Sequence, residues 1–207
     1  MLTFGRLFPL VDPMPAAVPS SRPYLLTGLI WLAAAIALGA SGRVAELRPP
    51  APQLVLLGLT AALILAGVAL PGFRGWLLAI PLRRLVALHV TRFVGAYFLV
   101  LYGRGQLPYA FAVPGGWGDI LTATLALGLV LLMPNIERAR LPVLGWNLLG
   151  LADILFVVAT AARLAFADPS SMAALLRLPL SLLPTFLVPI IIASHLLILV
   201  RLRRRPG

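Results

Sequence analysis

Six long runs of apolar residues alternate along the chain with short segments rich in arginine, proline or glycine. A helix that crosses a bilayer needs about 20 mostly apolar residues. The alternation therefore predicts an all-α integral membrane protein, folded as a six-helix transmembrane bundle. We expect the spans at residues 24–40, 53–70, 85–102, 117–133, 141–162 and 180–200.

Two of the intervening segments are too short or too polar to cross a bilayer themselves. Residues 72–84 combine arginines with Trp76, a residue type that favours the head-group level. We expect a bend or an interfacial helix there. Residues 167–179 are predicted to form a surface helix, with Ser170 or Ser171 as its N-cap.

The segment 103–119, GRGQLPYAFAVPGGWGD, is too apolar for an ordinary loop and contains too much glycine and proline for a helix. Non-helical backbone at membrane depth is tolerated only where protein or a water-filled cavity covers it. The composition therefore predicts a re-entrant-like loop between the third and fourth spans, with Tyr109 and Trp117 as candidate ligand contacts. Asp119 would cap the fourth span, or accept a cation or proton at the mouth of a cavity.

The composition supports the membrane class and excludes several kinds of function. The chain is 61% hydrophobic, has a mean hydropathy of +1.02 and is 11% charged, against about 25% charged in soluble domains. All 17 basic residues are arginine, as in proteins of bacteria with GC-rich codon usage. The absence of cysteine excludes disulfides and thiolate metal sites.

The arginines predict the orientation, because an arginine excess marks the cytoplasmic side of a membrane protein. With six spans, eleven arginines fall on the side of the termini and five on the other side. We therefore expect a multi-pass protein of the cytoplasmic (inner) membrane with both termini in the cytoplasm. The net charge of +11 then meets anionic lipid head groups at the cytoplasmic face, and nucleic acid is not an expected partner.

The predicted organisation is a single membrane domain between two short polar ends. Residues 1–23 contain several prolines and no apolar core of a signal peptide, so we expect an N-terminal cytoplasmic lead-in. Residues 24–200 form the six-span domain, and residues 201–207 form a basic cytoplasmic tail.

The two histidines of the chain fall at matching depths. His89 lies four residues, or roughly 6 Å, into the third span, and His195 lies roughly 7–8 Å from the cytoplasmic end of the sixth. Two imidazoles at one level can ligate a haem b iron from both faces, share a divalent metal or pass a proton. Each could equally donate to a carbonyl of a neighbouring helix, with no ligand at all.

Arg92 lies inside the third span, roughly 10 Å into the bilayer, three residues after His89. A charge at that depth needs a partner, and Asp153 and Asn147 in the fifth span are the candidates. The group either ties two spans together or anchors the anionic part of a ligand.

These residues favour an intramembrane polar pocket that binds a cofactor or small ligand, with bis-histidine haem as its most specific form. A small-solute or proton-coupled transporter working through Arg92, Asp119, Asn147 and Asp153 is the first alternative. A membrane enzyme that acts on a lipid-soluble substrate, with Asp119 or Asp153 as acid or base, is the second. Motifs of hydrolases, zinc proteases and nucleotide-binding proteins are absent from the sequence. The sequence leaves homo-oligomer formation open.

Overall fold

The computed structural model describes residues 21–203, and this part of the chain contains helices and no strands. The predicted lead-in, up to residue 20, and the end of the basic tail, 204–207, lie outside the described residues. The elements are α1 (Arg22–Ala40), α2 (Ala51–Ala69), α3 (Pro71–Ala79), α4 (Leu82–Leu88), η1 (His89–Val94), α5 (Gly95–Gly103), α6 (Tyr109–Leu132), α7 (Arg140–Ala167), η2 (Pro169–Leu176), η3 (Leu183–Leu187) and α8 (Val188–Arg203).

Within residues 21–203, six helical segments are long and apolar enough to cross a membrane, as the sequence predicts. Four of them are α1, α2, α6 and α7. The third, Leu82–Gly103, joins α4, η1 and α5, and the sixth, Leu183–Arg203, joins η3 and α8. The sixth segment starts with a π-turn that contains Pro184, and Pro189 follows one turn later. Proline and π-turns are the usual causes of bends in helices.

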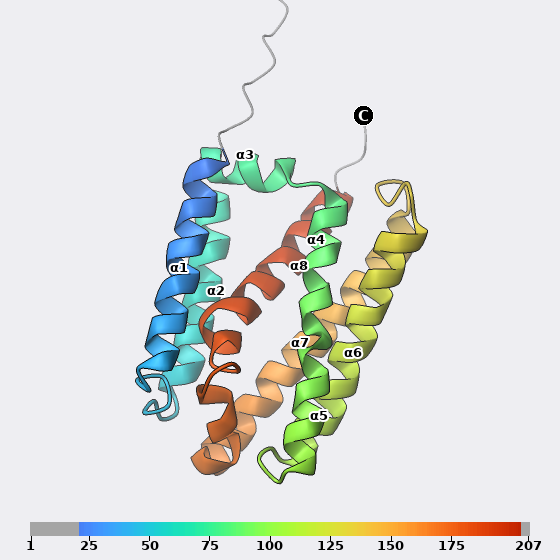
Figure 1. Cartoon of the computed structure of the whole chain (residues 1–207). Helices are drawn as coiled ribbons and strands as arrows, with labels where there is room; N and C mark the ends of the chain where they lie inside the picture. The colour runs from blue at the N-terminus through green and yellow to red at the C-terminus, as the bar shows by residue number, and fades with distance from the viewer. Residues whose placement is uncertain (1–20, 204–207) are drawn as a thin grey trace, which may run out of the picture.

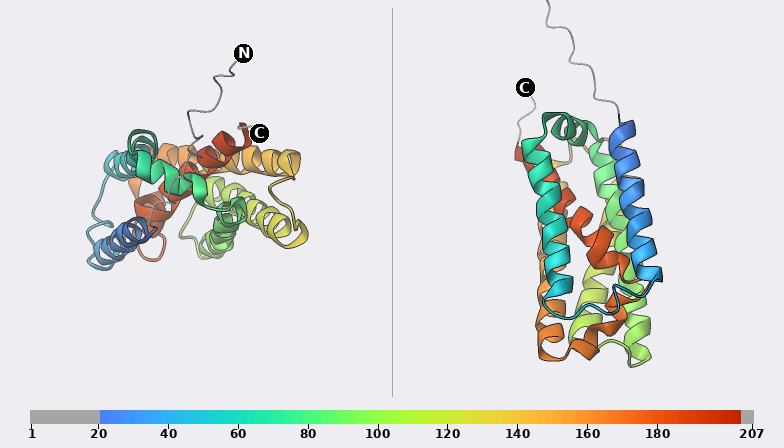
Figure 2. Two further views of the ribbon diagram at one scale, coloured as in Figure 1. Left: turned by 90° about the horizontal axis from the view of Figure 1, so that it is seen from above. Right: turned by 90° about the vertical axis from the view of Figure 1, so that its left-hand side faces the viewer.

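The helices form two unequal groups around α8. In Figure 1, α1 and α2 stand side by side on the left, while α4, α5, α6 and α7 form the larger group. The short helix α3 crosses one end of the bundle between these groups, and α8 runs diagonally through the middle (Figures 1 and 2). We call the end with α3 the terminal end, since α1 begins and α8 finishes there, and the other end the loop end.

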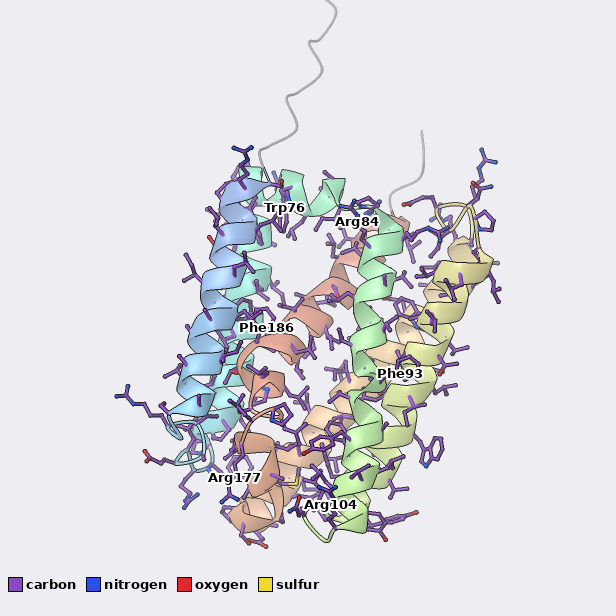
Figure 3. All side chains as sticks on the ribbon, viewed as in Figure 1. Trp76, Arg84, Phe93, Arg104, Arg177 and Phe186 are labelled. Carbon is purple, nitrogen blue, oxygen red and sulfur yellow. The ribbon has the colours of Figure 1, made fainter. Side chains whose placement is uncertain are left out.

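The helix α3 occupies the segment predicted to bend or to lie at the interface. It is only nine residues long and places Phe73 and Trp76 next to each other, with ring centroids 5.6 Å apart. Both rings contact the ring of Tyr24 in α1, at 5.3 Å and 5.1 Å. Figure 3 shows Trp76 at the terminal end, where this aromatic group joins α1 to α3.

The predicted re-entrant-like loop at 103–119 is wrong. The connection is short, and α6 begins at Tyr109 and continues through Pro114. Proline lacks the backbone N–H that an interior helical position donates, and glycine lowers helix propensity. Tertiary packing overrides both effects here, because Gly115 and Gly116 are buried against neighbouring helices. Asp119 consequently lies ten residues inside α6 and cannot cap it, so the predicted capping role is also wrong.

The segment predicted as a surface helix at 167–179 is helical, but its cap differs from the prediction. The residues form a 3-10 helix, and Asp168 is the N-cap in place of Ser170 or Ser171. The carboxylate of Asp168 accepts a hydrogen bond from the backbone N–H of Ser170 at 2.9 Å. Aspartate is among the preferred N-cap residues, because its charge also favours the positive end of a helix.

The two ends of the larger helix group are filled by separate apolar clusters. The cluster at the terminal end includes Leu82, Val86, Leu129, Val143 and Ile198. The cluster at the loop end includes Phe98, Leu101, Phe111, Met172 and Leu180. The polar residues of the spans lie between these two clusters.

Candidate functional site

Arg92 is the centre of a buried ionic group that connects three helical segments. It lies in η1, and its side chain is 1% exposed. Its Nε donates to Asp119 Oδ1 in α6 at 2.6 Å, and its Nη2 donates to Asp153 Oδ2 in α7. Its Nη1 donates to the carbonyl of Gly150 in α7 at 2.8 Å. We call Arg92, Asp119 and Asp153 the Arg92 cluster.

Glycine residues allow the Arg92 cluster to form, because they let the backbones approach. A Cβ atom on Gly95 would lie 2.5 Å from the carbonyl oxygen of Gly116 and 2.6 Å from Asp119 Cβ. Small residues permit such close approach between membrane helices. A Cβ atom on Gly118 would collide with the carboxylate of Asp153. Three of the five glycines in 103–119, namely Gly115, Gly116 and Gly118, are therefore contact positions of α6.

The sequence predicted Asp153 as a partner of Arg92 and missed Asp119. The contact between Arg92 and Asp153 is present, whereas the other candidate, Asn147, bonds to His195. Asp119 was missed because it was assigned to a loop. A count of charges offers a signal for it, since the apolar spans hold one deep cation and two carboxylates, and each buried charge needs a partner.

His89 and His195 lie together at the middle of the bundle, with ring centroids 4.1 Å apart. Both residues are fully buried. His89 Nε2 lies 3.1 Å from Ser194 Oγ, and His195 Nδ1 lies 2.8 Å from Asn147 Oδ1. We call His89 and His195 the histidine pair. The indole of Trp146 stands edge-on to His89, at a centroid distance of 4.9 Å.

The hydrogen bonds around the histidine pair indicate which ring nitrogen of each histidine carries the proton. Ser194 Oγ donates to the carbonyl of Ile191, so it accepts from His89 Nε2. The amide nitrogen of Asn147 donates to the carbonyl of His195, so the amide oxygen accepts from His195 Nδ1. A neutral imidazole carries one N–H. His89 Nδ1 and His195 Nε2 are thus left as bare acceptors, and both are buried without a hydrogen-bond partner.

This ring spacing does not fit the predicted haem. An iron ligated by both rings would hold their centroids about 6 Å apart, because each metal–nitrogen bond is about 2 Å long. The observed spacing of 4.1 Å leaves no room for a haem between the rings. For a divalent metal the pair offers two nitrogens, and no group of three or more His, Asp or Glu residues converges within residues 21–203. A metal at the histidine pair stays a prediction.

Two predicted ligand contacts lie away from this centre. Tyr109 is 61% exposed and Trp117 is 60% exposed, both on the outer face of α6. The structure therefore brings together six of the eight predicted site residues, and Tyr109 and Trp117 are the two that it leaves apart. The six are His89, Arg92, Asp119, Asn147, Asp153 and His195.

A cavity of about 470 Å³ reaches the Arg92 cluster from the loop end of the bundle. Its wall is almost entirely apolar and comes from α2, η1, α5, α6, α7, η2, η3 and α8. Apolar side chains along this wall include Leu56, Phe98, Phe111, Val158 and Leu183, and its polar part is formed by Gln53, Arg92 and Asp119. The volume lies within the range of about 300–1,000 Å³ that is usual for small-molecule sites.

Comparison with known protein families finds one family whose model matches most of the chain. The match covers residues 49–203. The chain belongs to the family described as Domain of unknown function (DUF8737). The match covers α2 to α8, and therefore the Arg92 cluster and the histidine pair, while α1 precedes it. No curated protein and no solved structure matches the chain.

Proposed function

We propose that this chain is a multi-pass membrane protein that binds a small lipophilic molecule in the cavity beside the Arg92 cluster. The observation that carries the proposal is an apolar cavity of about 470 Å³ with Arg92 and Asp119 in its wall. An apolar pocket with a few placed polar groups is the usual design of a small-molecule site. The arginine distribution supports the finer proposal of an inner-membrane protein with cytoplasmic termini.

The two ends of the bundle differ in a way that supports binding from the loop end. The cavity reaches Pro49 and Pro169 in the connections at that end. At the terminal end, the apolar cluster around Val86, Val143 and Ile198 packs between the helices. A ligand that enters from the loop end would stop at the Arg92 cluster, with the apolar cluster beyond it.

Native mass spectrometry of the full chain, extracted in a mild detergent, tests this proposal. We expect a co-purifying lipophilic molecule on the unmodified protein. Ala162→Trp should remove it, because Ala162 lines the cavity. Ala152→Trp should retain it, because Ala152 is exposed on the same helix and does not line the cavity. Equal occupancy in both variants would refute cavity binding.

Proton-coupled transport is a second candidate, and the charge of the Arg92 cluster favours it. Two carboxylates face one guanidinium, so the cluster carries one negative charge that a proton or a cation can neutralise. Ionisable residues within membrane helices often form proton pathways. Proteoliposomes that contain a pH-sensitive dye would report proton flux, and Asp119→Asn should abolish it. Flux that survives this change would exclude the carboxylate pathway.

A further inference from the structure

A second hollow, of about 420 Å³, lies at the loop end of the bundle and has a different chemistry from the cavity. We call it the arginine groove. Arg48, from the connection between α1 and α2, and Arg177, which follows η2, both line it. Both side chains are exposed, and neither has an ion-pair partner within residues 21–203. Figure 3 shows Arg177 and Arg104 at this end of the bundle, opposite Trp76.

The arginine groove continues directly from the cavity. Pro169 lines both hollows. Leu47 and Pro49 line the cavity, while Arg48 between them lines the groove. In the same way Leu176 lines the cavity and Arg177 lines the groove. The wall therefore changes from apolar to cationic at two separate places in the sequence, which is the arrangement that an amphiphilic molecule requires.

The groove keeps a net positive charge although one acid also lines it. Asp168 accepts hydrogen bonds from the hydroxyl and the backbone N–H of Ser170, at 2.7 Å and 2.9 Å. These bonds lower the pKa of the Asp168 carboxyl, so it is ionised at neutral pH. Two guanidinium groups then face one carboxylate. Glu46, in the same connection as Arg48, does not line the groove.

The Arg92 cluster offers no comparable place for an anion. The guanidinium of Arg92 already donates to two carboxylates and a carbonyl. An anionic group at that end of the cavity would meet the carboxylate of Asp119 and a guanidinium whose hydrogen bonds are already made. An anionic ligand would therefore point its apolar part toward Arg92 and keep its charge at the arginine groove.

We propose that the cavity and the arginine groove together bind a lipid with an anionic phosphate head group that carries no cation of its own, its acyl chain in the cavity and its phosphate between Arg48 and Arg177. This inference rests on the proposed function of the cavity. Arginine suits a phosphate, because its planar guanidinium donates two parallel hydrogen bonds to phosphate oxygens. An arginine close to an anionic lipid contributes a factor of about five in affinity.

Competition between lipids tests the assignment on the full chain in mixed micelles. The protein is given equimolar dioleoyl phosphatidic acid and dioleoyl phosphatidylcholine, and native mass spectrometry counts the bound lipids. We expect about fivefold more phosphatidic acid than phosphatidylcholine on the unmodified protein. The double variant Arg48→Gln/Arg177→Gln should bind the two lipids equally. Arg43→Gln is the matched control, since Arg43 is exposed in the same connection but does not line the groove.

The outcomes separate this inference from the proposed function. Equal binding of both lipids by the unmodified protein, or an equal loss in Arg43→Gln, would overturn the head-group assignment alone. If inorganic phosphate displaces phosphatidic acid at millimolar concentration, a lipid is overturned as the occupant, because the groove would then bind free phosphate without an acyl chain. Ala162→Trp should lose both lipids. If that variant retains both, the proposed function of the cavity fails as well.

Discussion

The Arg92 cluster and the histidine pair lie next to each other in the bundle, yet they differ in how many of their buried polar atoms have hydrogen-bond partners. Every buried nitrogen and oxygen of the Arg92 cluster has a partner, whereas one nitrogen of each histidine has none. Gly150 lies between them, since its carbonyl accepts from Arg92 and its Cα lies against the ring of His195. A buried charge left without a counter-charge costs several kcal/mol, while an unpaired acceptor on a neutral ring costs less. The charges of the Arg92 cluster therefore connect η1, α6 and α7, whereas the neutral histidine pair keeps two acceptor nitrogens free.

Removing both carboxylates of the Arg92 cluster should have the largest effect on stability. We expect Asp119→Asn/Asp153→Asn to destabilise the protein by about 3–5 kcal/mol, because it leaves a buried guanidinium that cannot lose its proton. Each single change should cost less than half of this, since the remaining carboxylate still neutralises Arg92. Thermal unfolding in detergent, followed by circular dichroism, would measure the differences.

The matched control for this series is Glu46→Gln, which removes an exposed carboxylate with no ion-pair partner within residues 21–203. Its effect should be within about 0.5 kcal/mol of zero. Strictly additive losses from Asp119→Asn and Asp153→Asn would show that the two carboxylates do not share Arg92. The three residues would then not act as one ionic group.

Gly150→Ala should disturb both groups at once and have the next largest effect. The added Cβ would lie 2.8 Å from His195 Cε1 and 2.8 Å from Thr122 Cγ2. We expect a loss of about 1–3 kcal/mol from overpacking. Gly145→Ala, on the same helix, meets no atom within 4 Å and should be neutral or stabilising by up to about 1 kcal/mol. Equal unfolding temperatures of the two variants would show that Gly150 is not a tight contact.

The helices and the depth of the polar residues could be predicted from the sequence, because apolar length and helical rise determine both. The six spans and the common depth of His89 and His195 follow from these two quantities. The contact between the two rings does not, because equal depth does not show that two helices touch. The start of α6 could not be predicted in this way. Proline and glycine at 114–116 favour a loop locally, and the packing of Gly115 against Val157 and of Gly116 against Gly95 explains why the segment is helical.

The sequence predicts which residues belong to the site better than it predicts which of them bond to each other. Depth along a helix says nothing about which side faces a neighbour, so it offers Asn147 beside Asp153 as a candidate partner of Arg92, whereas Asn147 bonds to His195. The arginine groove was beyond prediction, because Arg48 and Arg177 are separated by four spans in the sequence. Such a site depends on how the connections pack at the loop end.

His195→Leu should cost less than the loss of the two carboxylates, because it removes no charge. It leaves the amide oxygen of Asn147 buried without its donor, at a cost of about 1–2 kcal/mol. The double variant Asn147→Leu/His195→Leu should recover part of this loss, since an apolar pair leaves no unsatisfied group. A double variant that unfolds at a lower temperature than either single variant would contradict this account. Thermal unfolding under the conditions of the carboxylate series allows direct comparison.

Ser194→Ala should have the smallest effect on stability and the most specific effect on the histidine pair. Ser194 Oγ accepts from His89 Nε2, which fixes the proton on that nitrogen and leaves Nδ1 bare. Removing the hydroxyl should cost about 0.5–1.5 kcal/mol, the usual net value of one hydrogen bond.

Ser194→Ala should also allow the proton of His89 to occupy either ring nitrogen. His195 should keep its proton on Nδ1, because Asn147 still accepts from it. Nitrogen-15 NMR of histidine-labelled protein distinguishes the two tautomers of each ring. We expect His89 to show mixed tautomers in Ser194→Ala and a single one in the unmodified protein. A mixed signal from His89 in the unmodified protein would mean that Ser194 does not fix its proton. His89 Nδ1 would then not be a permanently bare acceptor, and the histidine pair would differ less from the fully paired Arg92 cluster.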